Sequence, residues 1–321
     1  HYIEAIKHLM HYLVVKELKD LSHFKPAEIV IPDDYLMMDV HTVRNLELVE
    51  TLRLKERTYS LIWLLDKTKT SMGSRKLKFW LMNPLKKKDL IEERYDKIEI
   101  LNQEFILKDE LRSALYNIYD IERLCGKVSC GSLNARDLLQ LKQSLKELPK
   151  IKEIVHNLHF DINIDTHEDL YKLLEEAIYE DPPVTVKEGY LIKEGYNKEL
   201  DELKQIRSGG KEFIASIENN LKEETGIKNL KVGFNKVFGY YIEITKGQIN
   251  NVPESLHWER RQTLTGCERY ISPELKEKEA LILNAEEKII DLEYCLFCDI
   301  KETIKKQILS LTDTANLIAE L

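Results

Sequence analysis

Hydrophobic residues recur at intervals of three and four positions along most of this chain, and that spacing predicts a succession of amphipathic helices. The two most regular segments lie on either side of residues 230–272. The first carries Leu200, Leu203, Ile206, Phe213, Ile217 and Leu221, and the second carries Leu275, Ile282, Ala285, Ile289, Leu292 and Leu296. Steps of seven, three and four in the second segment form a heptad seam, which is typical of helices packed side by side.

Local signals mark the ends of these two helices. Gly226 follows the first helix and can adopt the left-handed conformation that closes a helix. Ser272 before Pro273 predicts a capping side chain followed by a proline at the first helical position. Because one helix enters the intervening segment and the other leaves it, the helices run antiparallel if they pair. Gly209 and Gly210 interrupt the first helix and could bend it.

The segment between these helices shows a different pattern, in which hydrophobic and polar positions alternate at period two. The alternation covers residues 230–235 and 240–245, where β-branched and aromatic side chains are frequent. It predicts two half-buried strands, with turn residues for a hairpin at 235–239. A third run extends over residues 260–271. The sequence thus predicts a small sheet at the far end of a helical stalk, since about 25 helical residues span roughly 37 Å.

The charge of this predicted sheet is opposite to that of the whole chain. Residues 228–270 hold four acidic and seven basic side chains, in a chain of formal net charge −8. The basic residues are Lys228, Lys231, Lys236, Lys246, Arg260, Arg261 and Arg269. A basic region on an acidic protein indicates contact with a polyanion. The excess is small beside the number of phosphate contacts typical of DNA-binding proteins, so a solvated charged face remains the alternative.

Helical patterns also cover the first half of the chain. Residues 1–17 form an amphipathic pattern, residues 29–34 a short extended piece, and helical patterns continue through residues 88–148. Asp39 or Thr42 can cap the helix that follows the extended piece.

Two neighbouring elements are expected between residues 61 and 85. The stretch LIWLL at 61–65 is compact and apolar, and we expect it to be buried. The next helix stops near Pro84. Gly73 inside it costs roughly 1 kcal/mol relative to alanine, which suggests that another group packs close to it. Further along, the run Asp181-Pro182-Pro183 marks a linker at the end of the first helical block.

Composition narrows the class of protein. The chain has 321 residues, of which 43% are hydrophobic and 32% charged, with only 12 Gly and 8 Pro. These values fit a helix-rich globular protein of two or three domains. No apolar run approaches the roughly 18 residues of a membrane span, and no signal peptide is expected. His1 and Leu321 both fall inside apolar helical patterns, so we expect a segment of a longer protein.

Few residues offer catalytic or metal-binding chemistry. Cys295 and Cys298 lie one turn apart on a predicted helix without a second pair, which favours helix packing over a metal or redox site. The acidic residues between 165 and 180 are interpreted as a solvated helix face. The sequence contains no phosphate loop and no nucleophile elbow or Ser/His/Asp set. Nothing in it predicts chemistry on a substrate.

Several long segments resemble the MutS family of DNA mismatch-repair proteins, and they occur in the family's order. MDVHTVRNLELVETL and LLDKTKTSMGSRKLKFWLMNPL are similar to signatures of the family's core domain. PPVTVKEGYLIKEGYNKELDELK resembles the entry into its lever helix. LKVGFNKVFGYYIEITKGQ and RRQTLTGCERYISPELKEKE resemble its clamp and returning lever. Short connections favour the bacterial members.

The resemblance implies a mainly α fold. A multi-helical core would continue into long antiparallel lever helices that carry a small inserted α+β clamp domain at the tip. Residues 1–208 and 274–321 would form the discontinuous core and lever domain, and residues 209–273 the clamp. In the family, two such clamps close around duplex DNA and contact its backbone without reading its sequence.

The resemblance and the basic region together suggest which residues contact DNA phosphates. They are Lys246, Gln248, Arg260, Arg261, Thr265 and Gly266, with backbone N–H donors at the last two. Many family members have a Lys-Asn pair at the positions of Thr265 and Gly266, so this chain lacks a charge and an amide there. Lys231 and Lys236 are interpreted as residues that keep the hairpin soluble. No catalytic or metal-binding residue is predicted.

The resemblance also implies partners and functions outside these residues. The family's mismatch reader and its phosphate-loop ATPase are not in this sequence, so we expect neither mismatch recognition nor ATP hydrolysis here. ATP and Mg²⁺ would belong to the parent protein, and no cofactor is expected in this chain. Double-stranded DNA, a second MutS subunit and MutL are the expected partners. The chain itself is expected to be a cytoplasmic, nucleoid-associated monomer with weak, salt-sensitive DNA affinity.

Two other hypotheses remain open. A helical scaffold could bind protein partners through its heptad seam without direct DNA contact. An enzyme is the third hypothesis, and it requires detectable ATP turnover by this chain.

Overall fold

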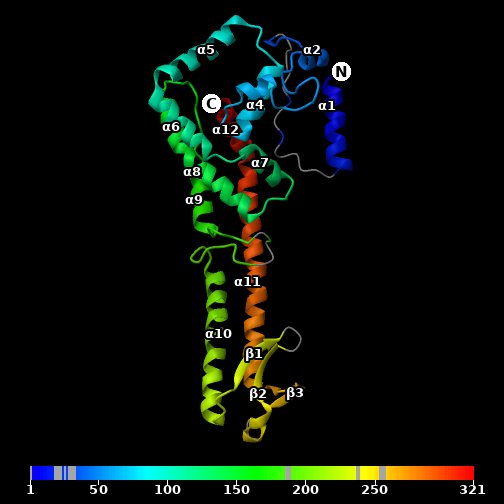
Figure 1. Ribbon diagram of the computed structural model, residues 1–321, viewed down its shortest axis with the longest axis vertical. Helices are drawn as coiled ribbons and strands as arrows, with labels where there is room; N and C mark the ends of the chain where they lie inside the picture. The colour runs from blue at the N-terminus through cyan, green and yellow to red at the C-terminus, as the bar shows by residue number, and fades with distance from the viewer. Residues whose placement is uncertain are drawn as a thin grey trace. The chain divides into compact units, whose positions relative to one another are not determined.

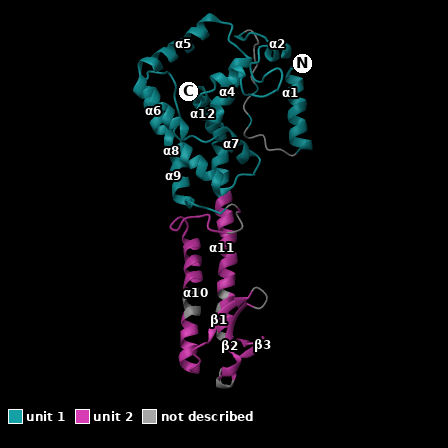
Figure 2. Cartoon of the chain, in the orientation of Figure 1, with its two compact units in different colours: residues 1–184, 299–321 teal, residues 185–298 magenta. Residues whose placement is uncertain are grey.

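The computed structural model describes residues 2–17, 24, 27, 34–183, 185, 189–235, 239–252 and 258–321. The chain divides into two compact units, one formed by His1–Val184 with Asp299–Leu321 and the other by Thr185–Cys298 (Figure 2). The described residues are mainly α-helical with one small antiparallel sheet, as the sequence pattern predicts. The predicted extended piece at 29–34 lies, except for Asp34, outside the described residues.

The first unit is built from helices. They are α1 (Tyr2–His11), the π-helix η1 (Tyr12–Lys16), α2 (Val40–Asn45), α3 (Leu61–Leu65), α4 (Ser71–Met82), α5 (Lys88–Gln103), α6 (Phe105–Tyr116), α7 (Ile121–Ser129), α8 (Ala135–Asn157), α9 (Glu168–Ala177), the end of α11 (Pro273–Lys306) and α12 (Ile308–Glu320). The C-terminal α12 packs against α4 and α7, and α8 packs against α6 and α9 (Figure 1). Aliphatic side chains dominate the resulting core.

Polar side chains cap two of these helices, and for α2 the sequence predicts the cap at Asp39 or Thr42. Asp39 accepts a hydrogen bond from the Thr42 backbone N–H at 2.6 Å, so Asp39 is the cap of α2. Thr70 accepts one from the Gly73 N–H at 2.9 Å at the start of α4. A Cβ on Gly73 would lie 3.0 Å from the Thr70 hydroxyl oxygen. The expectation of a close neighbour at Gly73 is therefore confirmed.

The expectation that residues 61–65 are buried is wrong. They form α3 behind an N-cap at Ser60, but only Ile62 is buried, whereas Leu64 is 61% exposed. A helix of five residues presents a single narrow face to the core, so its remaining apolar side chains point outward.

The helix α8 extends past the end of the predicted helical region at residue 148. It continues through Pro149 to Asn157 although proline removes a helical hydrogen bond. The turns after the proline bury Ile151, Ile154 and Val155. Burial of these side chains offsets the lost backbone bond.

The second unit contains two long helices and the sheet. Its elements are α10 (Lys198–Thr225), β1 (Lys231–Asn235), β2 (Gly239–Thr245), the 3₁₀ helix η4 (Lys246–Asn251), β3 (Glu259–Thr263), β4 (Cys267–Ile271) and α11 as far as Cys298. The helix α10 runs without interruption through Gly209 and Gly210. The expected interruption is absent because one or two helical glycines only lower helix stability and do not remove a hydrogen bond.

The ends of these two helices are as predicted. Gly226 closes α10 with φ of +67°, a left-handed conformation that favours glycine. The Ser272 hydroxyl accepts a hydrogen bond from the Leu275 N–H at 3.1 Å, which caps α11 at Pro273.

Contacts at both ends show that α10 and α11 run antiparallel (Figure 1). Near the start of α10, the Lys204 Nζ lies 3.2 Å from the Glu293 Oε1 of α11. Near its end, Ile217 and Leu221 share a buried cluster with Leu275 and Ile282 from the start of α11. The buried ion pair is extended by backbone groups, because Lys204 donates to the Ile192 carbonyl at 2.8 Å and Glu293 accepts from the Leu191 N–H at 3.2 Å.

The sheet has the strand order β1-β2-β4-β3 and every pairing is antiparallel. Asn235 pairs with Gly239 across the predicted hairpin, whose residues 236–238, including Lys236, lie outside the described residues. The single run predicted at 260–271 forms two strands. A turn at Thr265–Gly266 separates β3 from β4, and the Leu264 N–H donates to the Cys267 carbonyl at 2.9 Å across it.

Candidate nucleic-acid interface

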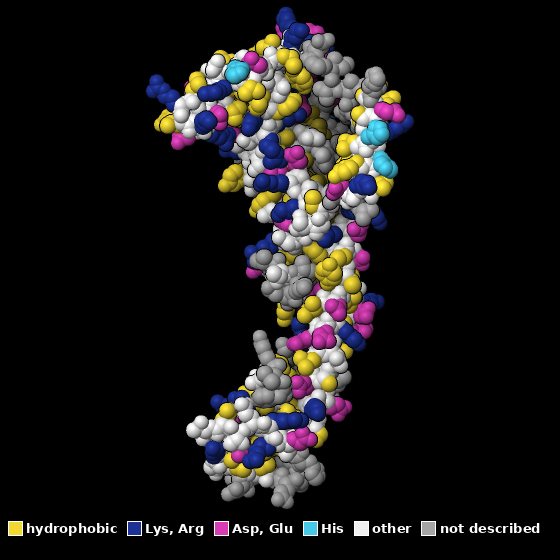
Figure 3. All heavy atoms as spheres, turned by 90° about the vertical axis from the view of Figure 1, so that its right-hand side faces the viewer, with side chains coloured by type: hydrophobic (Ala, Val, Ile, Leu, Met, Phe, Trp, Pro, Cys, Tyr) yellow, Lys and Arg dark blue, Asp and Glu magenta, His cyan; other side chains and the backbone are white. Residues whose placement is uncertain are grey.

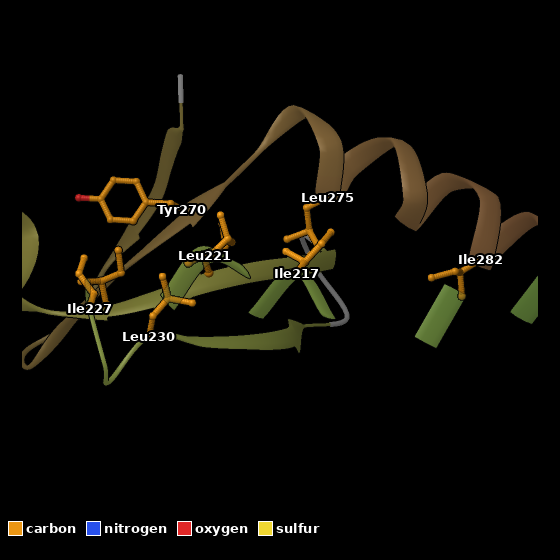
Figure 4. Packing of buried hydrophobic residues seen from close by; sticks show 9 residues of the cluster. Ile217, Leu221, Ile227, Leu230, Tyr270, Leu275 and Ile282 are labelled. Carbon is orange, nitrogen blue, oxygen red and sulfur yellow. The ribbon is translucent and has the colours of Figure 1, made fainter. Parts of the chain in front are cut away.

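A compact hydrophobic cluster fixes the sheet to the helix pair (Figure 4). It consists of Ile217, Leu221, Ile227, Leu230, Ile242, Ile244, Tyr270, Leu275 and Ile282. The period-two pattern explains the attachment, since alternate side chains of β2 point to the cluster and the others to the opposite face. The sheet is therefore attached to the helix pair at the end where α10 ends and α11 begins.

A row of polar side chains crosses the opposite face. Lys231, Glu243 and Arg269 are direct neighbours in the strand register, and Gln262 follows on β3. Arg269 donates from Nε to Glu243 at 2.9 Å and from Nη1 to Gln262 at 3.0 Å. Its guanidinium carbon also lies 4.2 Å from the centre of the Tyr241 ring. These contacts hold Arg269 in place and compensate its charge.

The structure brings three of the predicted site residues together at one end of the sheet. The Lys246 backbone N–H donates to the Gly266 carbonyl at 3.1 Å, which joins the start of η4 to the Thr265–Gly266 turn. All three residues are exposed. A Cβ added to Gly266 would meet no atom within 4 Å, so a large group can approach the turn backbone.

The two predicted arginines lie on β3 and each has a carboxylate partner. Arg260 Nη1 is 3.4 Å from Glu268, and Arg261 Nη2 is 3.0 Å from Glu259. Glu268 is 7% exposed and accepts a hydrogen bond of 2.5 Å from the Tyr270 hydroxyl. Burial, together with this hydrogen bond, raises the pKa of Tyr270 to about 12. The ion pairs reduce the net positive charge that β3 presents.

Gln248, the remaining predicted residue, lies in η4. Its Oε1 is buried and has no hydrogen-bond partner among the described residues. A buried carbonyl oxygen without a donor is unfavourable, and as an acceptor this oxygen cannot itself bind a phosphate oxygen.

Sequence reasoning missed the three carboxylates that pair with the sheet arginines. Glu243, Glu259 and Glu268 were counted only as negative charges. The sequence did hold a signal for one of these pairs. Alternation of side chains along the predicted strands places Glu243 and Arg269 on the same face of the sheet. Their direct pairing could not be read from it, since the register between strands 26 positions apart is a tertiary property.

The described residues contain no group of three or more His, Cys, Asp or Glu side chains that could hold a metal ion. Cys295 and Cys298 lie on α11 as free thiols. No helix in the described part of the chain is long and apolar enough to cross a membrane.

The fold belongs to a class of mainly helical proteins in which two antiparallel helices present a small sheet. The comparison with protein families identifies it further, because the family model for MutS domain III matches residues 41–321. This chain belongs to the MutS family.

The curated relatives agree with this assignment. The chain is 48% identical to the DNA mismatch repair protein MutS of Bacillus cytotoxicus over 325 positions, which cover 99% of the chain and 36% of the relative. It is 49% identical to that of Bacillus subtilis over 316 positions, covering 97% of the chain and 37% of the relative. The chain thus spans little more than a third of the length of these relatives.

Proposed function

We propose that this chain is the lever and clamp part of a DNA mismatch-repair ATPase, and that its sheet contacts the backbone of duplex DNA. The observation that carries the proposal is the backbone hydrogen bond from Lys246 to Gly266 at one end of the sheet. It places the exposed Lys246 beside the exposed Thr265–Gly266 turn. A cation beside accessible backbone is suited to phosphate oxygens. Such contacts give affinity and orientation without reading base sequence.

The ion pairs indicate which of the predicted residues contribute most to phosphate binding. Lys246 makes no ion pair with any of the described residues. Arg260 and Arg261 must share their donors with Glu268 and Glu259. We therefore expect Lys246 to contribute most of the salt-sensitive affinity of this group, with smaller contributions from Arg261 and Arg260.

The remaining activities belong, in this proposal, to other parts of the longer protein. Mismatch reading, ATP and Mg²⁺ binding, and contacts with a second subunit and with MutL are assigned there. The chain itself has no catalytic role and links DNA binding to the ATPase. The helix α11 supports such a link because it begins at the end of β4 and runs without interruption into the residues of the first unit.

The test is duplex binding as a function of salt, measured by fluorescence anisotropy for wild type and Lys246→Gln. Loss of one phosphate contact lowers the slope of log K against log salt by about one. Lys288→Gln removes the same charge from an exposed position on α11 and serves as the matched control. Absence of binding even at low salt, or curves for Lys246→Gln that coincide with the control, would refute the proposal.

A helical interaction module without DNA contact is the second candidate. It is favoured by the apolar side chains that α3 exposes, such as Leu64 and Trp63. Light scattering distinguishes the two functions. A stable oligomer that is unaffected by duplex DNA supports the interaction module, whereas a monomer that binds DNA supports the clamp.

A further inference from the structure

A hollow of about 340 Å³ lies where α10 ends and β1 begins. Lysines from three successive segments line it, namely Lys222 of α10, Lys228 of the connecting turn and Lys231 of β1. Asn229, Glu243 and Thr245 complete the polar part of its wall. We call this feature the lysine hollow. Because β1 and β3 are the two edges of the sheet, the hollow lies on the opposite edge from Arg260 and Arg261.

The carboxylates near the lysine hollow are already engaged. Glu243 is paired with Arg269 at 2.9 Å. Glu218, which lies beside the hollow on α10, is paired with Lys222 at 2.5 Å and accepts the Val232 N–H at 3.0 Å. These contacts hold the pKa of Glu218 below its usual value, with the Lys222 hydrogen bond as the main cause.

Two of the lysines make no ion pair with the described residues, although the charge of Lys231 helps to lower the pKa of Glu218. Lys228 and Lys231 are exposed, and no carboxylate of the described residues lies within ion-pair distance of either one. Like charges gathered around one concave surface repel each other, and a bound anion relieves that repulsion. The side-chain amide of Asn229 adds a neutral donor to the same wall.

We propose that the lysine hollow is an oxyanion site that binds one phosphate group between Lys228 and Lys231. A phosphodiester of duplex DNA and a free phosphate ion share this chemistry. Where the phosphate belongs to DNA, the inference rests on the proposed function and adds a second contact, on the β1 edge, to the one at Lys246. The two contacts would lie on different parts of the same sheet, which fixes the orientation of the duplex backbone more tightly than one contact can.

The first experiment tests the oxyanion chemistry without DNA. Sodium phosphate is titrated into ¹⁵N-labelled chain at constant ionic strength, with chloride as the reference, and the amide signals of residues 228–231 are followed. We expect saturable shifts in wild type that disappear in Lys228→Gln/Lys231→Gln. The control Lys276→Gln/Lys288→Gln removes two exposed charges from α11 and should behave as wild type. Shifts that are absent in wild type, or unchanged in the first variant, overturn the site.

The second experiment tests the source of the phosphate by duplex binding against salt for the same three proteins. Loss of the site should lower the salt slope by about one and weaken binding several-fold at low salt, beyond the effect of the control variant. Equal slopes for the two double variants overturn the DNA contact while leaving the proposed function intact. Phosphate binding without any duplex binding supports the oxyanion site and counts against the proposed function.

A gain-of-charge variant provides an independent check. Glu218→Gln removes the counter-charge of Lys222 but keeps a carbonyl oxygen that can accept the Val232 N–H. It should bind phosphate more tightly than Glu224→Gln, which removes an equal charge from an exposed position nearby on α10. Equal affinities for the two variants would show that the hollow does not concentrate positive charge at a site.

Discussion

At the scale of single residues, Asp66 shows how a polar network can hold a charge. Its carboxylate accepts hydrogen bonds of 2.6 Å from the hydroxyls of Thr68 and Ser74, and a further bond from Arg57. Burial opposes ionisation, but these hydrogen bonds outweigh it and lower the pKa of Asp66 to about 2. The network connects the end of α3 to the first turn of α4.

This depressed pKa predicts a specific dependence of stability on pH. The unfolded carboxyl titrates near 3.9, so its stabilising contribution is complete above about pH 4 and is lost as the pH falls toward 2. Asp66→Asn should lower the free energy of unfolding at pH 6 by about 1–2 kcal/mol. Urea denaturation should show this deficit shrinking below pH 4. The exposed Asp109→Asn is the control, and a deficit that stays constant with pH would contradict the mechanism.

At the scale of elements, two glycines of α10 should respond to alanine in opposite ways. Gly209 lies inside the continuous helix with no atom within 4 Å of an added Cβ, whereas Gly226 ends it at φ of +67°. Gly209→Ala should stabilise the chain by about 0.5–1 kcal/mol, and Gly226→Ala should destabilise it by about 1 kcal/mol. Thermal denaturation followed by circular dichroism measures both changes. Destabilisation by Gly209→Ala would indicate that α10 is not helical at that point.

The Thr265–Gly266 turn allows a gain-of-function test. Gly266 does not have a positive φ, and an added Cβ meets open space, so side chains are tolerated. Thr265→Lys/Gly266→Asn should tighten duplex binding at low salt and steepen the salt slope by about one. Thr58→Lys adds the same charge at an exposed position in the first unit and should leave the slope nearly unchanged. An equal response of the two variants would argue against a phosphate contact at the turn.

At the scale of the whole molecule, the proposed function predicts that the affinity for duplex DNA does not depend on whether the bases are correctly paired. Contacts with phosphates alone carry no sequence information. A matched duplex and the same duplex with one mismatch should therefore bind with dissociation constants that agree within about twofold. Competition between labelled and unlabelled duplexes provides the measurement. A clear preference for the mismatched duplex would place a base-reading element within this chain.

Features that depend on neighbouring residues could be predicted from the sequence, whereas features that depend on distant segments could not. The helical pattern, the cap of α2 (predicted at Asp39 or Thr42), the cap at Ser272 and the stop at Gly226 depend on neighbouring residues, and the sequence predicted them. The exposure of α3 and the pairing of Arg269 with Glu243 depend on which distant segments pack nearby. The candidate site was predicted in part, since Lys246, Thr265 and Gly266 meet at one end of the sheet, while the partners of the arginines required the strand register.

The buried Lys204–Glu293 pair limits the motions available to the second unit. Glu293 is completely buried. If α10 slid along α11 by one turn, the Glu293 carboxylate would remain buried but would lose its counter-ion Lys204. Stranding such a charge costs on the order of 3–5 kcal/mol. Sliding of α10 along α11 is thus disfavoured. We therefore expect a displacement of the sheet to move both helices together as one rigid element.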